Sequence, residues 1–206
     1  MRHALKRSSR AGAREGKSIG DALCAKTPGR KPGEAATNKI SLGKAIQFSH
    51  NVVRLFIMSL TSVYIHIVFR TKSSVPALPL DCSEKLYKYI WGISRNFGVK
   101  LLRINGMEDH VHLFIRLPAS VSVAEFVRTV KANSSRWLKH SGAFPNFVGW
   151  AAEYAAFSYA EKDKAVIINY VKNQREHHKR ISFSEEIENI FREFDAAEKI
   201  PYFWRD

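Results

Sequence analysis

The sequence predicts an α+β fold, with an antiparallel sheet packed with helices over residues 58–206. Strand-like and helix-like segments follow one another in the order β-α-β-β-α-β, which is the order of a ferredoxin-like or RRM-like sheet. Two more helix-like segments follow, and the first of them carries Tyr170. A hydrophobic content of 45% in 206 residues is enough for one domain core.

Composition and spacing mark the first strand and the first helix. Residues 62–70, SVYIHIVFR, are β-branched and aromatic without a breaker, which is typical of a buried strand. Residues 83–98 predict a helix with Ser83 as its N-cap and Gly98 as its end. The apolar residues of this helix recur at helical spacing: Leu86, Tyr89, Ile90, Ile93 and Phe97.

A hairpin and a second helix come next. Residues 99–104 and 110–117 predict two strands joined by a short turn around Asn105-Gly106. The helix over residues 122–142 begins with a capping box, in which Ser122 is the N-cap and Glu125 is the acidic partner. Its apolar face comprises Phe126, Val130 and Trp137.

The last third of the chain completes the pattern. The aromatic segment over residues 147–160 supplies the fourth strand, and residues 161–180 and 182–196 predict two helices. No internal repeat is apparent in the sequence.

Residues 1–57 differ in composition from the rest of the chain. They carry 12 Lys and Arg against 3 Asp and Glu, so this segment has a net charge of +9 and leaves +5 of the total of +14 for the remainder. Such a basic, Ser-rich segment without apolar periodicity predicts disorder. We interpret Met58 as the true start, which would make residues 1–57 upstream sequence without a selected role. A transit-like leader and a nucleic-acid-binding arm stay open as alternatives.

The compartment is indicated by the cysteines and by the longest apolar run. Cys24 and Cys82 form no CxxC motif, so neither a disulfide framework nor a zinc knuckle is predicted. The run VVRLFIMSL contains Arg54 and is too short to span a membrane. We therefore expect a cytoplasmic protein without a membrane segment.

Two histidines stand inside the apolar run EDHVHLFI. In a strand, residues i and i+2 point to the same face, so His110 and His112 project side by side in a geometry that suits one metal ion. The ordinary alternative is a pair of surface or core histidines with hydrogen-bond partners. His66, inside the first strand, fits a packed or hydrogen-bonded residue better than a ligand.

A tyrosine and a glutamine near the C-terminal end of the chain form a second candidate group. In INYVKNQ, Tyr170 and Gln174 are spaced i,i+4 and so share one face of a helix. His177 shares the face of Tyr170 at i+7, and its role and that of His178 are left open. The ordinary alternative to a functional role is that the tyrosine is packed half-buried on the helix and the glutamine is solvated.

Together, four segments of the chain resemble the HUH single-strand DNA transposases of bacterial insertion sequences, of the one-tyrosine class. These segments are the opening strand YIHIVF, the turn RINGMEDH, the strand in DHVHLFI and the helix YVKNQ followed by EHHK. The resemblance runs from about Ser59 to Phe194. It implies Tyr170 as the nucleophile that forms a 5′-phosphotyrosine link. It also implies His110, His112 and Gln174 as ligands of Mg²⁺ or Mn²⁺. The implied partners are single-stranded DNA with hairpin ends and a second copy of the chain, without a nucleotide cofactor.

The helix over residues 122–142 offers candidate phosphate contacts, although a charged helix face is more often only solvated. The candidates are Lys131, Asn133, Ser134, Ser135, Arg136 and Lys139.

Three other functions stay open. A non-catalytic nucleic-acid-binding module would not need Tyr170. A metallohydrolase would use water as the nucleophile and an acid beside the histidines, where Asp109 is expected to face away from the pair. A host-adopted relative of the same family would process repeated palindromes. In the homodimers of the family that this chain resembles, the tyrosine helix of one subunit completes the metal site of the other. We therefore expect the Tyr170 helix to dock on a partner's sheet, while docking on its own sheet stays open.

Overall fold

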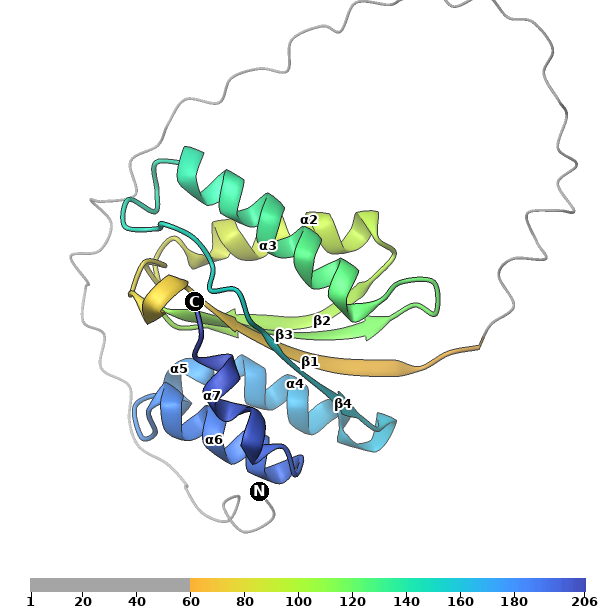
Figure 1. Cartoon of the computed structure of the whole chain (residues 1–206). Helices are drawn as coiled ribbons and strands as arrows, with labels where there is room; N and C mark the ends of the chain where they lie inside the picture. Colours follow the sequence, from red (N-terminus) through yellow and green to blue (C-terminus); the bar gives the residue numbers. More distant parts are fainter. Residues whose placement is uncertain (1–59) are drawn as a thin grey trace, which may run out of the picture. The chain divides into compact units, whose positions relative to one another are not determined.

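The computed structural model describes residues 60–206, which form a four-stranded antiparallel sheet with helices on both faces (Figure 1). The strand order is β2-β3-β1-β4, so β3 lies between its hairpin partner β2 and β1, and β4 pairs with the other edge of β1. The strands are β1 (Val63–Arg70), β2 (Lys100–Gly106), β3 (His110–Leu117) and β4 (Ala155–Tyr159). The predicted α+β, ferredoxin-like fold is confirmed.

The helices form two layers around this sheet. Figure 1 shows α2 and α3 on one face and α4 to α7 on the other. Their bounds are α2 (Ser83–Asn96), α3 (Val123–His140), α4 (Lys164–Lys172), α5 (Gln174–His177), α6 (Phe183–Glu193) and α7 (Ile200–Phe203). Short 3₁₀ turns η3 (Lys72–Ser74), η4 (Glu161–Asp163) and η5 (Ala197–Lys199) connect them.

The predictions for residues 1–57 and for Met58 lie outside the described residues. Within residues 60–206, no helix combines the length and the apolar character that a membrane span requires.

The hairpin turn lies later than predicted. Asn105 and Gly106 belong to β2, where they pair with His112 and Val111 of β3, so the prediction of a turn at these two residues is wrong. The Asn105 side chain also donates from Nδ2 to the carbonyl of Lys172, at 2.9 Å. This long-range bond and the strand pairing hold Asn105 extended, and the chain turns over residues 107–109 instead.

The helix starts were predicted with mixed success. Ser122 is the N-cap of α3, and its hydroxyl accepts from the Glu125 amide at 3.2 Å, as the capping box predicted. The prediction of Ser83 as the cap of α2 is wrong, because Cys82 holds that position. The Ser83 hydroxyl donates instead to the Leu80 carbonyl at 2.8 Å, which ties the helix to the preceding turn.

The single helix predicted over residues 161–180 is divided into η4, α4 and α5. Asn173, with φ −98° and ψ 18°, separates α4 from α5. Tyr170 is therefore near the end of one helix and Gln174 begins the next. The prediction that Tyr170 and Gln174 share one continuous helix is therefore wrong.

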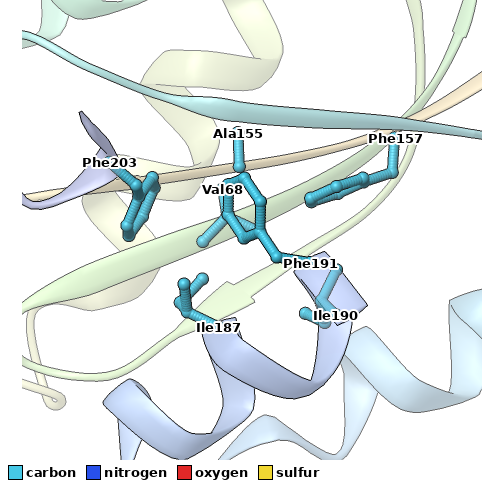
Figure 2. Close-up of a cluster of buried hydrophobic side chains, with 7 residues drawn as sticks. All are labelled: Val68, Ala155, Phe157, Ile187, Ile190, Phe191 and Phe203. Atoms are coloured by element: carbon cyan, nitrogen blue, oxygen red, sulfur yellow. The ribbon is translucent and has the colours of Figure 1, made fainter. Parts of the chain in front are cut away.

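An apolar cluster fixes α6 against the sheet. Figure 2 shows its seven side chains, which come from β1, β4, α6 and α7: Val68, Ala155, Phe157, Ile187, Ile190, Phe191 and Phe203. All are at most 7% exposed, and full burial of a large apolar side chain stabilises by about 1.5–3 kcal/mol. Glu186 precedes Ile187, so the same anchoring holds Glu186 over the sheet.

The close approach of β2 to β3 requires glycine at position 106. A Cβ there would lie 2.2 Å from the His110 carbonyl oxygen and 2.9 Å from Val111 Cα, which are backbone atoms that cannot rotate away. We expect Gly106→Ala to lower the free energy of unfolding by about 1–3 kcal/mol and to displace His110. Urea denaturation measures the loss.

Gly92 is the matched control for this substitution. It lies inside α2, and a Cβ at this position meets no atom within 4 Å. Gly92→Ala is expected to raise the free energy of unfolding by about 0.5–1 kcal/mol, because alanine loses less backbone entropy in a helix. Equal effects of the two substitutions would contradict the strand contact.

Candidate active site

Side chains from β3, α5 and α6 meet on the face of the sheet that α4 to α7 cover. His110 and His112 of β3 are both fully buried, and their ring centroids are 5.0 Å apart. Their shared face is the one predicted from strand alternation. His178, directly after α5, completes the group, with its ring centroid 4.7 Å from that of His110.

A carboxylate that the sequence analysis did not name lies at the centre of the group. Glu186 of α6 is 2% exposed. Its Oε1 accepts hydrogen bonds from the Tyr170 hydroxyl and from Gln174 Nε2, the latter at 2.9 Å. Its Oε2 lies 3.1 Å from His178 Nε2 and 3.5 Å from His112 Nε2. One carboxylate thus joins the predicted nucleophile to the predicted histidines.

The sequence did contain a signal for Glu186. It stands next to Ile187 and four residues before Ile190, so helical spacing places it on the buried face of α6, whereas Glu185 is exposed. An acid on an apolar helix face requires a partner, because an unpaired buried charge is costly. The partners come from distant elements, and local spacing does not identify them.

The charges in the site depend on one another. Burial raises the pKa of Glu186, but the contacts with His112, His178 and Tyr170 outweigh burial and hold that pKa below its usual value. Burial, together with the charge of Glu186, raises the pKa of Tyr170 above its usual value. The site therefore holds a carboxylate and a protonated phenol that donates to it.

The buried imidazoles of His66 in β1 and His110 in β3 are neutral. Burial lowers the pKa of His110 to about 4 and that of His66 to about 3. At neutral pH each ring therefore keeps a lone pair on one nitrogen. A neutral imidazole is the form that binds a metal ion.

His66 and Asp109 contact the Nδ1 atoms of the histidine pair. His66 Nε2 lies 3.0 Å from His112 Nδ1, which agrees with the expected hydrogen-bonded role of His66. Asp109 Oδ1 lies 2.7 Å from His110 Nδ1, so the expectation that Asp109 faces away from the pair is wrong. The difference arises because β3 begins at His110, so the strand alternation does not extend to Asp109.

Buried polar atoms without a hydrogen-bond partner gather in this site. They include the Nε2 atoms of four histidines and one oxygen each of Gln174 and Glu186: His110 Nε2, His112 Nε2, His177 Nε2, His178 Nε2, Gln174 Oε1 and Glu186 Oε2. Leaving such a group unsatisfied costs about 1–3 kcal/mol. These atoms are all metal-ligating types, so the residues fit a divalent cation.

The candidate DNA contacts of α3 divide into two groups. Ser134 is fully buried, donates to the Val130 carbonyl at 2.6 Å and accepts from Trp150 Nε1 at 3.0 Å, so its hydroxyl has no surface to offer DNA. Lys131 Nζ donates to the Ala152 carbonyl at 2.6 Å. Ser134 is therefore not accessible to DNA, whereas DNA contact at Lys131 stays a prediction.

The remaining candidates on α3 face solvent to different degrees. Arg136 and Lys139 are exposed, and Ser135 and Asn133 are half-buried. Asn133 Nδ2 donates to the Thr129 carbonyl at 3.0 Å. Helix α3 lies across the sheet from α4 to α6 (Figure 1), so these residues do not line the site around Glu186. DNA contact at Ser135, Arg136 and Lys139 stays a prediction.

Residues 59–174 match the family described as "Transposase IS200 like". The ISDra2 transposase TnpA of Deinococcus radiodurans is 22% identical over 118 residues, which cover 54% of this chain and 83% of that protein. A crystal structure described as that of a transposase from Deinococcus radiodurans is 22% identical, with a TM-score of 0.43 over 57% of this chain and 94% of that chain. A REP-associated tyrosine transposase bound to a REP hairpin is 13% identical, with a TM-score of 0.42 over 58% of this chain and 70% of that chain.

Proposed function

Because this chain belongs to the family of IS200-like transposases, we propose that it nicks and rejoins single-stranded DNA with hairpin ends through a 5′-phosphotyrosine at Tyr170. One observation carries the proposal. The Tyr170 hydroxyl and the His112 imidazole lie on the two oxygens of one carboxylate, that of Glu186. A nucleophile and a group of metal-ligating atoms therefore meet at one point.

The proposed cleavage balances without an external nucleotide. Tyr170 Oη forms a bond to the phosphorus, and the bond from phosphorus to the 3′ oxygen breaks. The proton of the phenol is directed at Glu186 Oε1, and the departing 3′ oxygen gains a proton to become a hydroxyl. The phosphotyrosine keeps the energy of the broken ester, so the 3′ hydroxyl of a second strand can reverse the step and join new ends.

The proposed cofactor is a divalent cation, Mg²⁺ or Mn²⁺. By resemblance to the family, His110, His112 and Gln174 would hold it, and in each of them a potential ligand atom is buried and without a hydrogen-bond partner. When bound, such a cation offsets the negative charge that develops on the phosphate during displacement. The neutral imidazole of His110 can take up this role without first losing a proton.

Glu186 also favours a second candidate function. A metallohydrolase would use a water nucleophile and an acid beside the histidines, and Glu186 Oε2 lies 3.5 Å from His112 Nε2. Both candidates cut DNA at a metal site. They differ in whether the protein becomes covalently attached to its product.

The test incubates the purified full chain with single-stranded oligonucleotides carrying hairpin ends, with Mn²⁺, with Mg²⁺ or with chelator. We expect a covalent protein–DNA band that resists denaturation, carries the 5′ phosphate side of the cut and is absent with chelator. Cleavage without any adduct would favour the hydrolase, and binding without cleavage would favour a non-catalytic module. Hairpins from repeated palindromes in the same assay test the host-adopted alternative.

We propose that the protein works in the cytoplasm as a homodimer. The structure of one chain packs α4 against its own sheet, where the Lys172 carbonyl accepts from Asn105 of β2. The tyrosine and the histidines thus meet within one chain. A dimer of this arrangement would carry two complete sites rather than two shared ones.

A further inference from the structure

The site contains more potential ligands than the family resemblance assigns. We propose that His178 and Glu186 are metal ligands together with His110 and His112, so that three imidazoles and one carboxylate form a site for a divalent transition-metal ion. The inference deepens the proposed function, because it rests on the same histidine pair. It adds a carboxylate from α6 and an imidazole from the segment after α5.

The four side chains have the spacing that one ion requires. One potential ligand atom from each residue can be chosen so that all four lie within 4.8 Å of one another. Metal–ligand bonds of about 2.0–2.2 Å place neighbouring ligand atoms about 3–4 Å apart. Glu186 Oε2 lies 3.1 Å from His178 Nε2 and 3.5 Å from His112 Nε2, so small movements complete the shell.

The four atoms also share burial and the lack of another partner. His110 Nε2, His112 Nε2, His178 Nε2 and Glu186 Oε2 are all buried without a hydrogen-bond partner. His110 and His112 are 0% exposed, and Glu186 is 2% exposed. Buried polar atoms are normally satisfied, so four ligand atoms around one point that have no partner outside their own group require an explanation. A bound cation supplies it.

Hydrogen bonds at Nδ1 of His110 and His178 determine that the other ring nitrogen, Nε2, faces the ion. His110 Nδ1 lies 2.7 Å from Asp109 Oδ1, and His178 Nδ1 lies 3.1 Å from the Ile181 carbonyl oxygen. A carboxylate and a carbonyl only accept hydrogen bonds, so each ring carries a proton on Nδ1 and can present the lone pair of Nε2. Metal-bound histidines are commonly held in this way.

His112 has an equivalent support. Its Nδ1 lies 3.0 Å from His66 Nε2. When His66 carries its proton on Nδ1, its Nε2 accepts from His112 Nδ1, and His112 Nε2 is left with a lone pair for the ion. His66 is thus a positioning residue for the third imidazole.

The composition of the site determines which ions it prefers. Imidazole nitrogens suit divalent transition-metal ions, Zn²⁺ more than Mn²⁺, whereas Mg²⁺ prefers oxygen ligands and keeps its water. The site should therefore bind Mn²⁺ more tightly than Mg²⁺. Glu186 Oε2 faces the ion in this arrangement, while Oε1 accepts from Tyr170 and so joins the nucleophile to the metal.

His177 provides a matched control. Its Nε2 is also buried without a hydrogen-bond partner, but it lies 3.7 Å from Glu186 Oε1, the oxygen that faces Tyr170, and its side chain is 32% exposed. It is therefore a histidine of the same segment, next to the same carboxylate, that does not belong to the group of four. The contrast between His177→Ala and His178→Ala separates ligation from a general effect of removing a histidine.

Calorimetric titration of the full chain with Mn²⁺ tests the proposal. We expect His178→Ala and Glu186→Gln each to weaken the affinity at least about 100-fold, since even residues that only support ligands contribute about 10- to 100-fold. The affinity of His177→Ala is expected to stay within about threefold of wild type, which is less than that supporting effect. Thermal unfolding with and without Mn²⁺ provides a second readout, because an ion that binds the folded state raises the Tm.

If a variant fails to fold, pulsed electron paramagnetic resonance of the Mn²⁺-loaded wild type counts the imidazoles bound to the ion. Three coordinated imidazoles are expected. Two imidazoles, or wild-type affinity in His178→Ala and Glu186→Gln, would overturn the inference and leave the histidine pair of the proposed function intact. If the wild type binds Mn²⁺ through all four residues but forms no covalent DNA adduct, the proposed function would be overturned instead. Absence of any Mn²⁺ binding would refute both metal roles.

Discussion

Tyr170→Phe is expected to abolish the covalent protein–DNA adduct while DNA binding is retained. The substitution removes the oxygen that attacks phosphorus and keeps the ring, which packs edge-on against His66 and His112 with centroids 6.0 and 6.3 Å apart. Removal of a nucleophile leaves no route to the phosphotyrosine, so we expect a loss of at least about 10³-fold. Denaturing gels measure the adduct, and fluorescence anisotropy measures binding.

Tyr159→Phe is the control for this result. Tyr159 of β4 also lies near the site, with its ring centroid 6.3 Å from that of His66, and it loses the same atom. The control should form adduct at the wild-type level. Tyr170→Phe also removes a donor to Glu186, at a cost of about 1–3 kcal/mol in the free energy of unfolding, so denaturation must show that the variant is folded. An undiminished adduct in folded Tyr170→Phe would refute the assignment of the nucleophile.

The parts of this site that the sequence predicted are those governed by local periodicity. Alternation along β3 placed His110 and His112 on one face, and the capping pattern placed the start of α3 at Ser122. Both patterns depend on neighbours in the chain and require no knowledge of the fold. The resemblance to the one-tyrosine transposases is confirmed by the family match over residues 59–174.

The parts that the sequence did not predict depend on contacts between distant elements. Asn105 stays in β2 because it pairs with β3 and donates to Lys172, 67 positions later in the chain. Glu186 reaches the histidines because the cluster in Figure 2 anchors α6 on β1 and β4. The role of His178 follows only once α6 is in place. A sequence pattern can indicate that a buried acid needs a partner, but the fold decides which partner it has.

His112→Ala is expected to abolish cleavage, and mixing it with Tyr170→Phe is expected to restore none. In this structure Tyr170 and His112 contact the same Glu186 within one chain, so neither variant holds a complete site. If the helix of Tyr170 docked on a partner's sheet instead, half of the dimers in an equal mixture would be mixed, and each would hold one intact site of two. The mixture would then regain about a quarter of the wild-type cleavage.

Prolonged co-incubation or co-expression ensures exchange of chains, and wild type mixed with either variant provides the reference for dilution. Because His112 is fully buried, denaturation has to show that its variant folds. Cleavage that appears only on mixing would show that the site is shared between two chains and would refute the docking within one chain described here.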